Sequence, residues 1–71
     1  MLIGKYIAQY TGRTMCGFIN SHEYIINIDK DIYGYQVTGI KDITTDEDDT
    51  GYITYASETS LKRNWDIKHD I

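Results

Sequence analysis

The stretch from Gly17 to Ile43 decides the fold of this chain, and its centre reads Tyr24-Ile-Ile-Asn-Ile-Asp-Lys30 and then Tyr35-Gln-Val-Thr-Gly-Ile40. In both segments apolar residues alternate with polar ones, which is the pattern of a half-buried strand. The residues between them, Lys30-Asp-Ile-Tyr-Gly34, suit a turn, because Asp tolerates unusual backbone angles and Gly supplies a positive φ. We therefore predict two antiparallel strands joined by this turn, with the rest of the chain wrapped around them.

The same alternation predicts which residues form the core and where the second strand bends. We expect Ile26, Ile28, Val37 and Ile53 to be buried. Gly39 stands where alternation requires a core residue, and a glycine inside a strand often marks a bulge. We therefore predict that the second strand bends at Gly39, as strands do in small barrels where one strand serves two sheets.

The totals set the class of protein. The 71 residues make one small domain, 1–71, and a domain of this size buries only about 60% of its unfolded surface. Cys16 is the only cysteine, so no internal disulfide can form. The first residues lack the apolar stretch of a signal peptide, and no run approaches the roughly 18 apolar residues of a membrane span. We expect a cytoplasmic protein without membrane contact.

Composition favours strands elsewhere in the chain. The 7 tyrosines and the abundant isoleucine are typical of strands, whereas good helix formers are scarce. Further strands are expected at 2–10, 51–56 and 65–67, a short strand or diverging turn at 15–19, and the acidic tip of a hairpin at 44–50. Residues 57–64 are the only helical candidate, with Ser57 or Ser60 as its cap and Lys62 and Arg63 near its C-terminal end.

This order of elements resembles the SH3-like small β-barrel. Ile7-Ala-Gln-Tyr10 is similar to the aromatic-rich first segment of SH3 domains, Gly17 to Ile26 to their diverging turn, and Thr50-Gly-Tyr-Ile53 to the segment before their short 3₁₀ helix. The resemblance implies an all-β, five-stranded antiparallel barrel with one short 3₁₀ or helical turn near the C-terminus. Proline-rich ligands are not expected, because Tyr35 replaces the groove Trp and the chain contains no Pro.

The net charge indicates the kind of partner, and the amino-acid composition indicates the kind of genome that encodes the chain. Acidic residues outnumber basic ones by 11 to 7, and the net charge is −4. A protein that neutralises phosphate groups should be basic, so a protein partner is expected rather than nucleic acid. Ile, Asn, Lys and Tyr have AT-rich codons, which indicates an AT-rich genome such as those of low-GC bacteria and their phages.

The densest charge is the segment Asp46-Glu47-Asp48-Asp49. One interpretation is a solvated hairpin tip, and the other is a negative surface that docks on a basic protein groove. A calcium loop is not expected, because Ser57 stands where an EF-hand requires a bidentate Glu.

The tyrosines are the second candidate feature. Tyr6 or Tyr24 suits the core with its hydroxyl at the rim, but so small an interior cannot hold all seven rings. The residues expected to form an exposed cluster are Tyr33, Tyr35, Tyr52 and Tyr55. Tyrosine is frequent among the residues that dominate binding energy, and an exposed tyrosine can also stack on a base. Tyr33, Tyr35 and Tyr55 therefore join the four acidic residues as the predicted protein-binding site.

Catalytic chemistry finds little support in the sequence. His22 and His69 are far apart, and nothing supplies an orienting group or an oxyanion hole for Cys16. Cys16 and His22 are too few ligands for a zinc site. We expect no enzymatic activity, no cofactor and no metal.

The sequence thus predicts a non-catalytic protein-binding module. Its size, its acidity and the AT-rich coding suggest a phage or mobile-element accessory protein that inhibits a host nucleic-acid enzyme or defence factor. One alternative is a nucleic-acid-binding SH3-like barrel that uses Tyr35 and Tyr55 with Lys62 and Arg63. Another is a structural protein that self-associates, for example as a homodimer, through a strand edge or the apolar face of the first strand.

Overall fold

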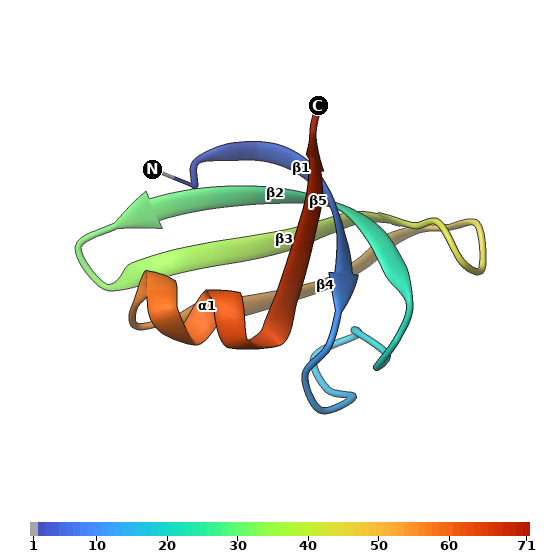
Figure 1. Ribbon diagram of the computed structural model, residues 1–71, viewed down its shortest axis with the longest axis horizontal. Coiled ribbons are helices and arrows are strands. Elements are labelled where there is room, and N and C mark those ends of the chain that lie inside the picture. Colours follow the sequence, from blue (N-terminus) through green and yellow to red (C-terminus); the bar gives the residue numbers. More distant parts are fainter. Residues whose placement is uncertain (1) are drawn as a thin grey trace.

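The computed structural model describes residues 2–71 and contains five antiparallel strands in one sheet and one short helix (Figure 1). The elements are β1 (Gly4–Tyr10), β2 (Glu23–Asp31), β3 (Gly34–Asp42), β4 (Glu47–Tyr55), α1 (Glu58–Asn64) and β5 (Trp65–Asp70). Their order across the sheet is β4-β3-β2-β1-β5, so β4 and β5 are its edges. The expectation of a mostly β chain with five antiparallel strands and a short helical element before the last strand is confirmed.

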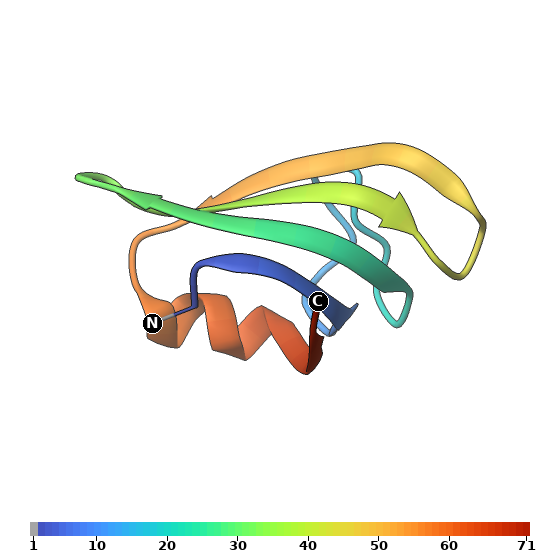
Figure 2. The same cartoon turned by 90° about the horizontal axis from the view of Figure 1, so that it is seen from above.

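The sheet is not closed into a barrel, which corrects the expectation of a closed architecture. Two other segments cover the core instead: α1, which runs along one side of the bent sheet in Figure 2, and the loop around Met15–Phe18. The backbone N–H of Tyr52 on edge strand β4 donates to the carbonyl of Cys16 in this loop at 3.3 Å. Phe18 and Leu61, one from each segment, are fully buried.

The central hairpin has the predicted alternation. Ile26, Ile28 and Val37 have no exposed surface, and Ile53 packs partly buried against them. The register pairs Asp31 with Gly34, so only Ile32 and Tyr33 form the turn. The predicted irregularity at Gly39 is confirmed, since the register of β3 shifts there against both neighbouring strands. A Cβ atom at Gly39 would collide with the hydroxyl of Thr50 and lie 2.7 Å from Cε1 of Phe18, so a side chain there would crowd both residues.

An aromatic cluster forms one end of the core. Trp65 packs against Tyr10, Phe18 and Tyr24 with ring centroids 4.9–5.7 Å apart. Aromatic pairs at these distances stabilise a core beyond the area that they bury. Trp65 begins β5, so this cluster fixes the last strand beside β1.

The helix is capped as predicted, whereas strands β4 and β5 are longer than predicted. Ser57 caps α1 as expected, because its hydroxyl accepts the N–H of Ser60 at 3.2 Å. Strand β5 continues to Asp70, and β4 begins at Glu47, so three of the four clustered acidic residues belong to a strand. Within residues 2–71 no helix has the length and hydropathy to cross a membrane.

Candidate protein-binding site

The predicted site residues lie at two opposite ends of the molecule. Strand β3 separates the β2–β3 turn, which carries Tyr33, from the β3–β4 turn, which carries Asp46 (Figure 1). A nine-residue strand spans about 30 Å, close to the 32 Å long axis of the molecule. The structure therefore does not bring Tyr33 next to the acidic residues.

The acidic hairpin, which we define as residues 42–49, presents the side chains of Asp46, Glu47, Asp48 and Asp49 to solvent. Glu47, Asp48 and Asp49 are exposed, and none of them forms an ion pair within residues 2–71. Asp46 pairs with the ammonium of Lys41 at 2.8 Å, and the hydrogen bond from Lys41 lowers the pKa of the Asp46 carboxyl. Asp46 and Asp49 have positive φ angles of 64° and 51°, which Asp accepts more readily than most residues. The hairpin thus leaves three carboxylates available to a partner.

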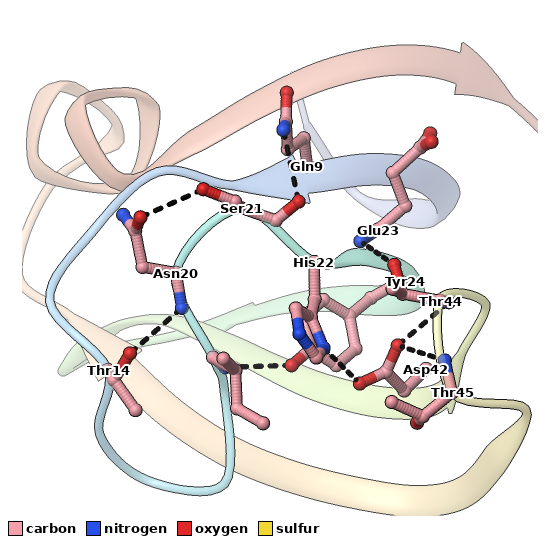
Figure 3. Close-up of polar contacts among 11 residues, drawn as sticks. Gln9, Thr14, Asn20, Ser21, His22, Glu23, Tyr24, Asp42, Thr44 and Thr45 are labelled. Atoms are coloured by element: carbon pink, nitrogen blue, oxygen red, sulfur yellow. Dashed lines mark hydrogen bonds and ion pairs between the residues drawn. The ribbon is translucent and has the colours of Figure 1, made fainter.

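Asp42 organises the base of the acidic hairpin (Figure 3). Its Oδ1 accepts the backbone N–H groups of Thr44 and Thr45 at 2.9 and 3.1 Å, and its Oδ2 lies 2.8 Å from Nδ1 of His22. Burial raises the pKa of the Asp42 carboxyl, but the hydrogen bonds from His22 and Thr45 together outweigh it, so the net pKa is lowered. Asp42 is only 3% exposed, and its carboxylate accepts several N–H groups, so it holds the turn around it in one conformation.

The same turn is tied to the start of β2. The Ile43 N–H donates to the Glu23 carbonyl at 2.8 Å, and the Glu23 N–H donates to the Thr44 hydroxyl at 2.9 Å. Next to His22, the Tyr24 hydroxyl accepts the N–H of Ile19 at 2.7 Å, which connects the loop before β2 to the core. These contacts join the acidic hairpin to strand β2, so its exposed carboxylates project from a turn that is held in place.

Sequence reasoning missed this support. An Asp two residues before a Thr is a signal for a local turn in which the carboxylate accepts backbone N–H groups, and Asp42 has that pattern. His22 gave no such signal, because it lies 20 residues away in sequence from its partner.

Two of the predicted aromatic residues are not exposed. Tyr35 and Tyr55 each have only 8% of their surface exposed, so the expectation that they join an exposed cluster is wrong. They are partners across β3 and β4 and lie on the faces of Val37 and Ile53, respectively, which point into the core. Tyr33 and Tyr52 are exposed as expected, at 78% and 55%.

Two other features bear on chemistry, the Cys16 thiol and the contact between His22 and Asp42. Cys16 is exposed, and no group of three or more His, Cys, Asp or Glu side chains is placed to hold a metal ion in this part of the chain. Asp42 also accepts the backbone N–H groups of Thr44 and Thr45, so its contact with His22 helps to hold the turn in place.

Comparison of the chain with protein-family models, with curated proteins and with solved structures finds no match.

Proposed function

We propose that this chain is a non-catalytic protein-binding module whose acidic hairpin docks on a basic protein surface. The observation that supports this proposal is that exposed carboxylates stand on a turn held in place by hydrogen bonds. Glu47, Asp48 and Asp49 are exposed, and Asp42 accepts the backbone N–H groups of the turn beside them. A braced loop loses less conformational freedom on binding than a mobile one, so more of the contact energy appears as affinity.

Electrostatics gives the proposed contact a kinetic signature. Exposed charges act mainly by steering the approach of an oppositely charged partner. This attraction is screened over about 8 Å at physiological salt. Binding through the acidic hairpin should therefore show fast association that slows as salt is added.

The burial of Tyr35 and Tyr55 favours a protein partner over nucleic acid. These two rings were the stacking residues of the nucleic-acid alternative, and at 8% exposure neither presents a face to a base. The net charge of −4 opposes phosphate binding as well.

The proposal extends to an SH3-like fold and to an inhibitory biological role. Five antiparallel strands with a helical turn before the last one support an SH3-like fold, and the unclosed sheet is where this chain departs from it. A small acidic binding module suits a phage or mobile-element protein that inhibits a host nucleic-acid enzyme or defence factor, since such enzymes have basic grooves.

The test uses two variants that remove equal charge. Asp48→Asn with Asp49→Asn neutralises the hairpin, and Asn accepts the positive φ of residue 49. Asp66→Asn with Asp70→Asn is the control, because both residues are exposed and lie on β5. Proteins that bind the tagged wild-type chain in a low-GC bacterial lysate are purified, and their association rates are measured between low and physiological salt.

We expect the hairpin variant to associate more slowly and with a flatter salt dependence, and the control to behave like the wild type. Titration with DNA and RNA completes the test. Equal effects of both variants would remove the hairpin from the contact. Tighter nucleic-acid binding by the hairpin variant, without loss for any protein, would overturn the proposal.

A further inference from the structure

The β2–β3 turn carries the two most exposed large apolar residues of the described chain. Ile32 is 91% exposed and Tyr33 is 78% exposed, and they are adjacent at the tip of the hairpin. Exposed apolar residues scattered singly are ordinary on a protein surface, but neighbouring ones on a protruding turn mark a binding site more often. We call these two residues the apolar tip.

The apolar tip is held in one shape by polar contacts behind it. Oδ1 of Asp31 accepts the N–H of Tyr33 at 2.7 Å, and Nε2 of Gln36 donates to the carbonyl of Gly34 at 3.3 Å. Gly34 has a φ of 134°, and a Cβ there would collide with the carbonyl oxygen of Tyr55. The hairpin therefore presents Ile32 and Tyr33 from a fixed turn.

Local folding does not explain the identity of these residues. Gly34 carries the positive φ of this hairpin, whereas Ile32 and Tyr33 do not have positive φ angles, so the backbone of the turn accepts most residue types at both positions. The exposed side chains of Ile32 and Tyr33 also add little to the core. Their presence side by side at the exposed tip points to an intermolecular contact.

We propose that the apolar tip inserts into an apolar pocket, rimmed by basic groups, on a different protein. The flanking charges select this partner: Asp29 and Asp31 are exposed beside the tip, and the only cation of residues 29–36, Lys30, lies over the ring of Tyr35 at 5.7 Å. An anionic membrane, or a second copy of a chain with net charge −4, would repel these carboxylates. The tip lies at the other end of the molecule from the acidic hairpin, so it is a second contact site.

The experiment places a photo-crosslinker at the tip and at a matched position. Tyr33→p-benzoylphenylalanine reports on the tip, and Tyr52→p-benzoylphenylalanine reports on an exposed tyrosine of β4. Both proteins are irradiated in a low-GC bacterial lysate, and the crosslinked protein is identified and purified. Its affinity is then measured for Ile32→Ser and Tyr33→Ser, with Ile71→Ser and Tyr52→Ser as controls at exposed Ile and Tyr positions.

We expect one protein to crosslink from position 33 and not from position 52. Each tip substitution should weaken its binding by about 30-fold, the size expected for a residue that dominates an interface, through faster dissociation at every salt concentration. The melting temperature should stay at the wild-type value. Because loss at the acidic hairpin slows association instead, failure at one site is separable from failure at the other.

Four results would overturn the assignment. They are crosslinking only to a second copy of the chain, binding to phosphatidylcholine–phosphatidylglycerol vesicles that Ile32→Ser abolishes, no tip-specific product, and equal affinities for tip and control variants. A lower melting temperature for the tip variants than for their controls would also count against it, because the residues would then serve the fold.

Discussion

The indole N–H of Trp65 donates a hydrogen bond to the hydroxyl of Tyr55 at 3.0 Å inside the core. Tyr55 ends β4 and Trp65 begins β5, so this bond joins the two strands on either side of α1. Neither residue has more than 8% of its surface exposed. This buried hydrogen bond thus connects the two edge strands of the sheet, which do not pair with each other.

Replacement of Tyr55 by Phe should destabilise the protein. The substitution leaves the Trp65 N–H buried without its acceptor, which typically costs about 1–3 kcal/mol. We expect a loss of this size in the free energy of unfolding, measured by urea denaturation at neutral pH. Tyr33→Phe, at a position with 78% exposure, is the control and should leave the value unchanged.

The same tyrosine should make the fold sensitive to alkali. Burial raises the pKa of the Tyr55 hydroxyl to about 12, above the ordinary value of about 10. A group with a raised pKa in the folded state stabilises the fold below the unfolded pKa and loses this contribution as pH rises toward the folded one. We expect the wild type to lose more stability than Tyr55→Phe between about pH 10 and pH 12. Parallel losses in the two proteins would show that Tyr55 does not titrate from a buried site.

Asp42 should have the opposite pH dependence. The pKa of its carboxyl is lowered in the folded protein, so its contribution is present above the ordinary value of about 4 and is lost as pH falls through the folded pKa. Asp42→Asn should cost about 1.5–3 kcal/mol at neutral pH, the range for hydrogen bonds to a charged group. Below about pH 4 the difference between the variant and the wild type should shrink.

Denaturation curves at several pH values test this expectation for Asp42. Asp29→Asn, an exposed carboxylate on β2, serves as the control. A constant difference between Asp42→Asn and the wild type from neutral to acid pH would mean that the charge of Asp42 contributes nothing to the fold.

Two isoleucines four residues apart should respond very differently to truncation. Ile28 has no exposed surface, whereas Ile32 is 91% exposed. Ile28→Ala should cost roughly 2–5 kcal/mol, which approaches the whole stability of so small a domain, and we expect it to be largely unfolded. Ile32→Ala should stay within about 0.5 kcal/mol of the wild type. A cooperative melt of Ile28→Ala near the wild-type temperature would contradict the core assignment.

Gly4 and Gly34 allow backbone strain to be separated from crowding. Their φ angles are similar, 130° and 134°, but a Cβ at Gly4 would have no neighbour within 4 Å among residues 2–71, while at Gly34 it would collide with the Tyr55 carbonyl. Gly4→Ala should therefore show only the cost of an unfavourable φ, about 1–3 kcal/mol. Gly34→Ala should cost clearly more, as measured by thermal unfolding. Equal costs would show that the hairpin end adjusts to a side chain.

Some features of the candidate site could be predicted from the sequence, and others could not. Tyr35 shares the strand face of Val37, so strict use of the two-residue period would have placed it in the core. The contact between His22 and Asp42 was out of reach, because it depends on how β2 and β3 pair over 20 intervening residues. The end-to-end separation of Tyr33 from the acidic residues depends on how far β3 extends past Gly39, where alternation in the sequence fails.

The sequence by itself determined the β class, the central hairpin, the bulge at Gly39 and the capped helix at the end of the chain. These features depend on neighbours a few residues apart, whose periodicity and backbone preferences are written locally. Tertiary structure alone decided that the sheet stays open, with Phe18 and Leu61 covering the core, and that the acidic hairpin is braced through Asp42. Those outcomes depend on contacts between distant segments, which form only when the whole chain has packed.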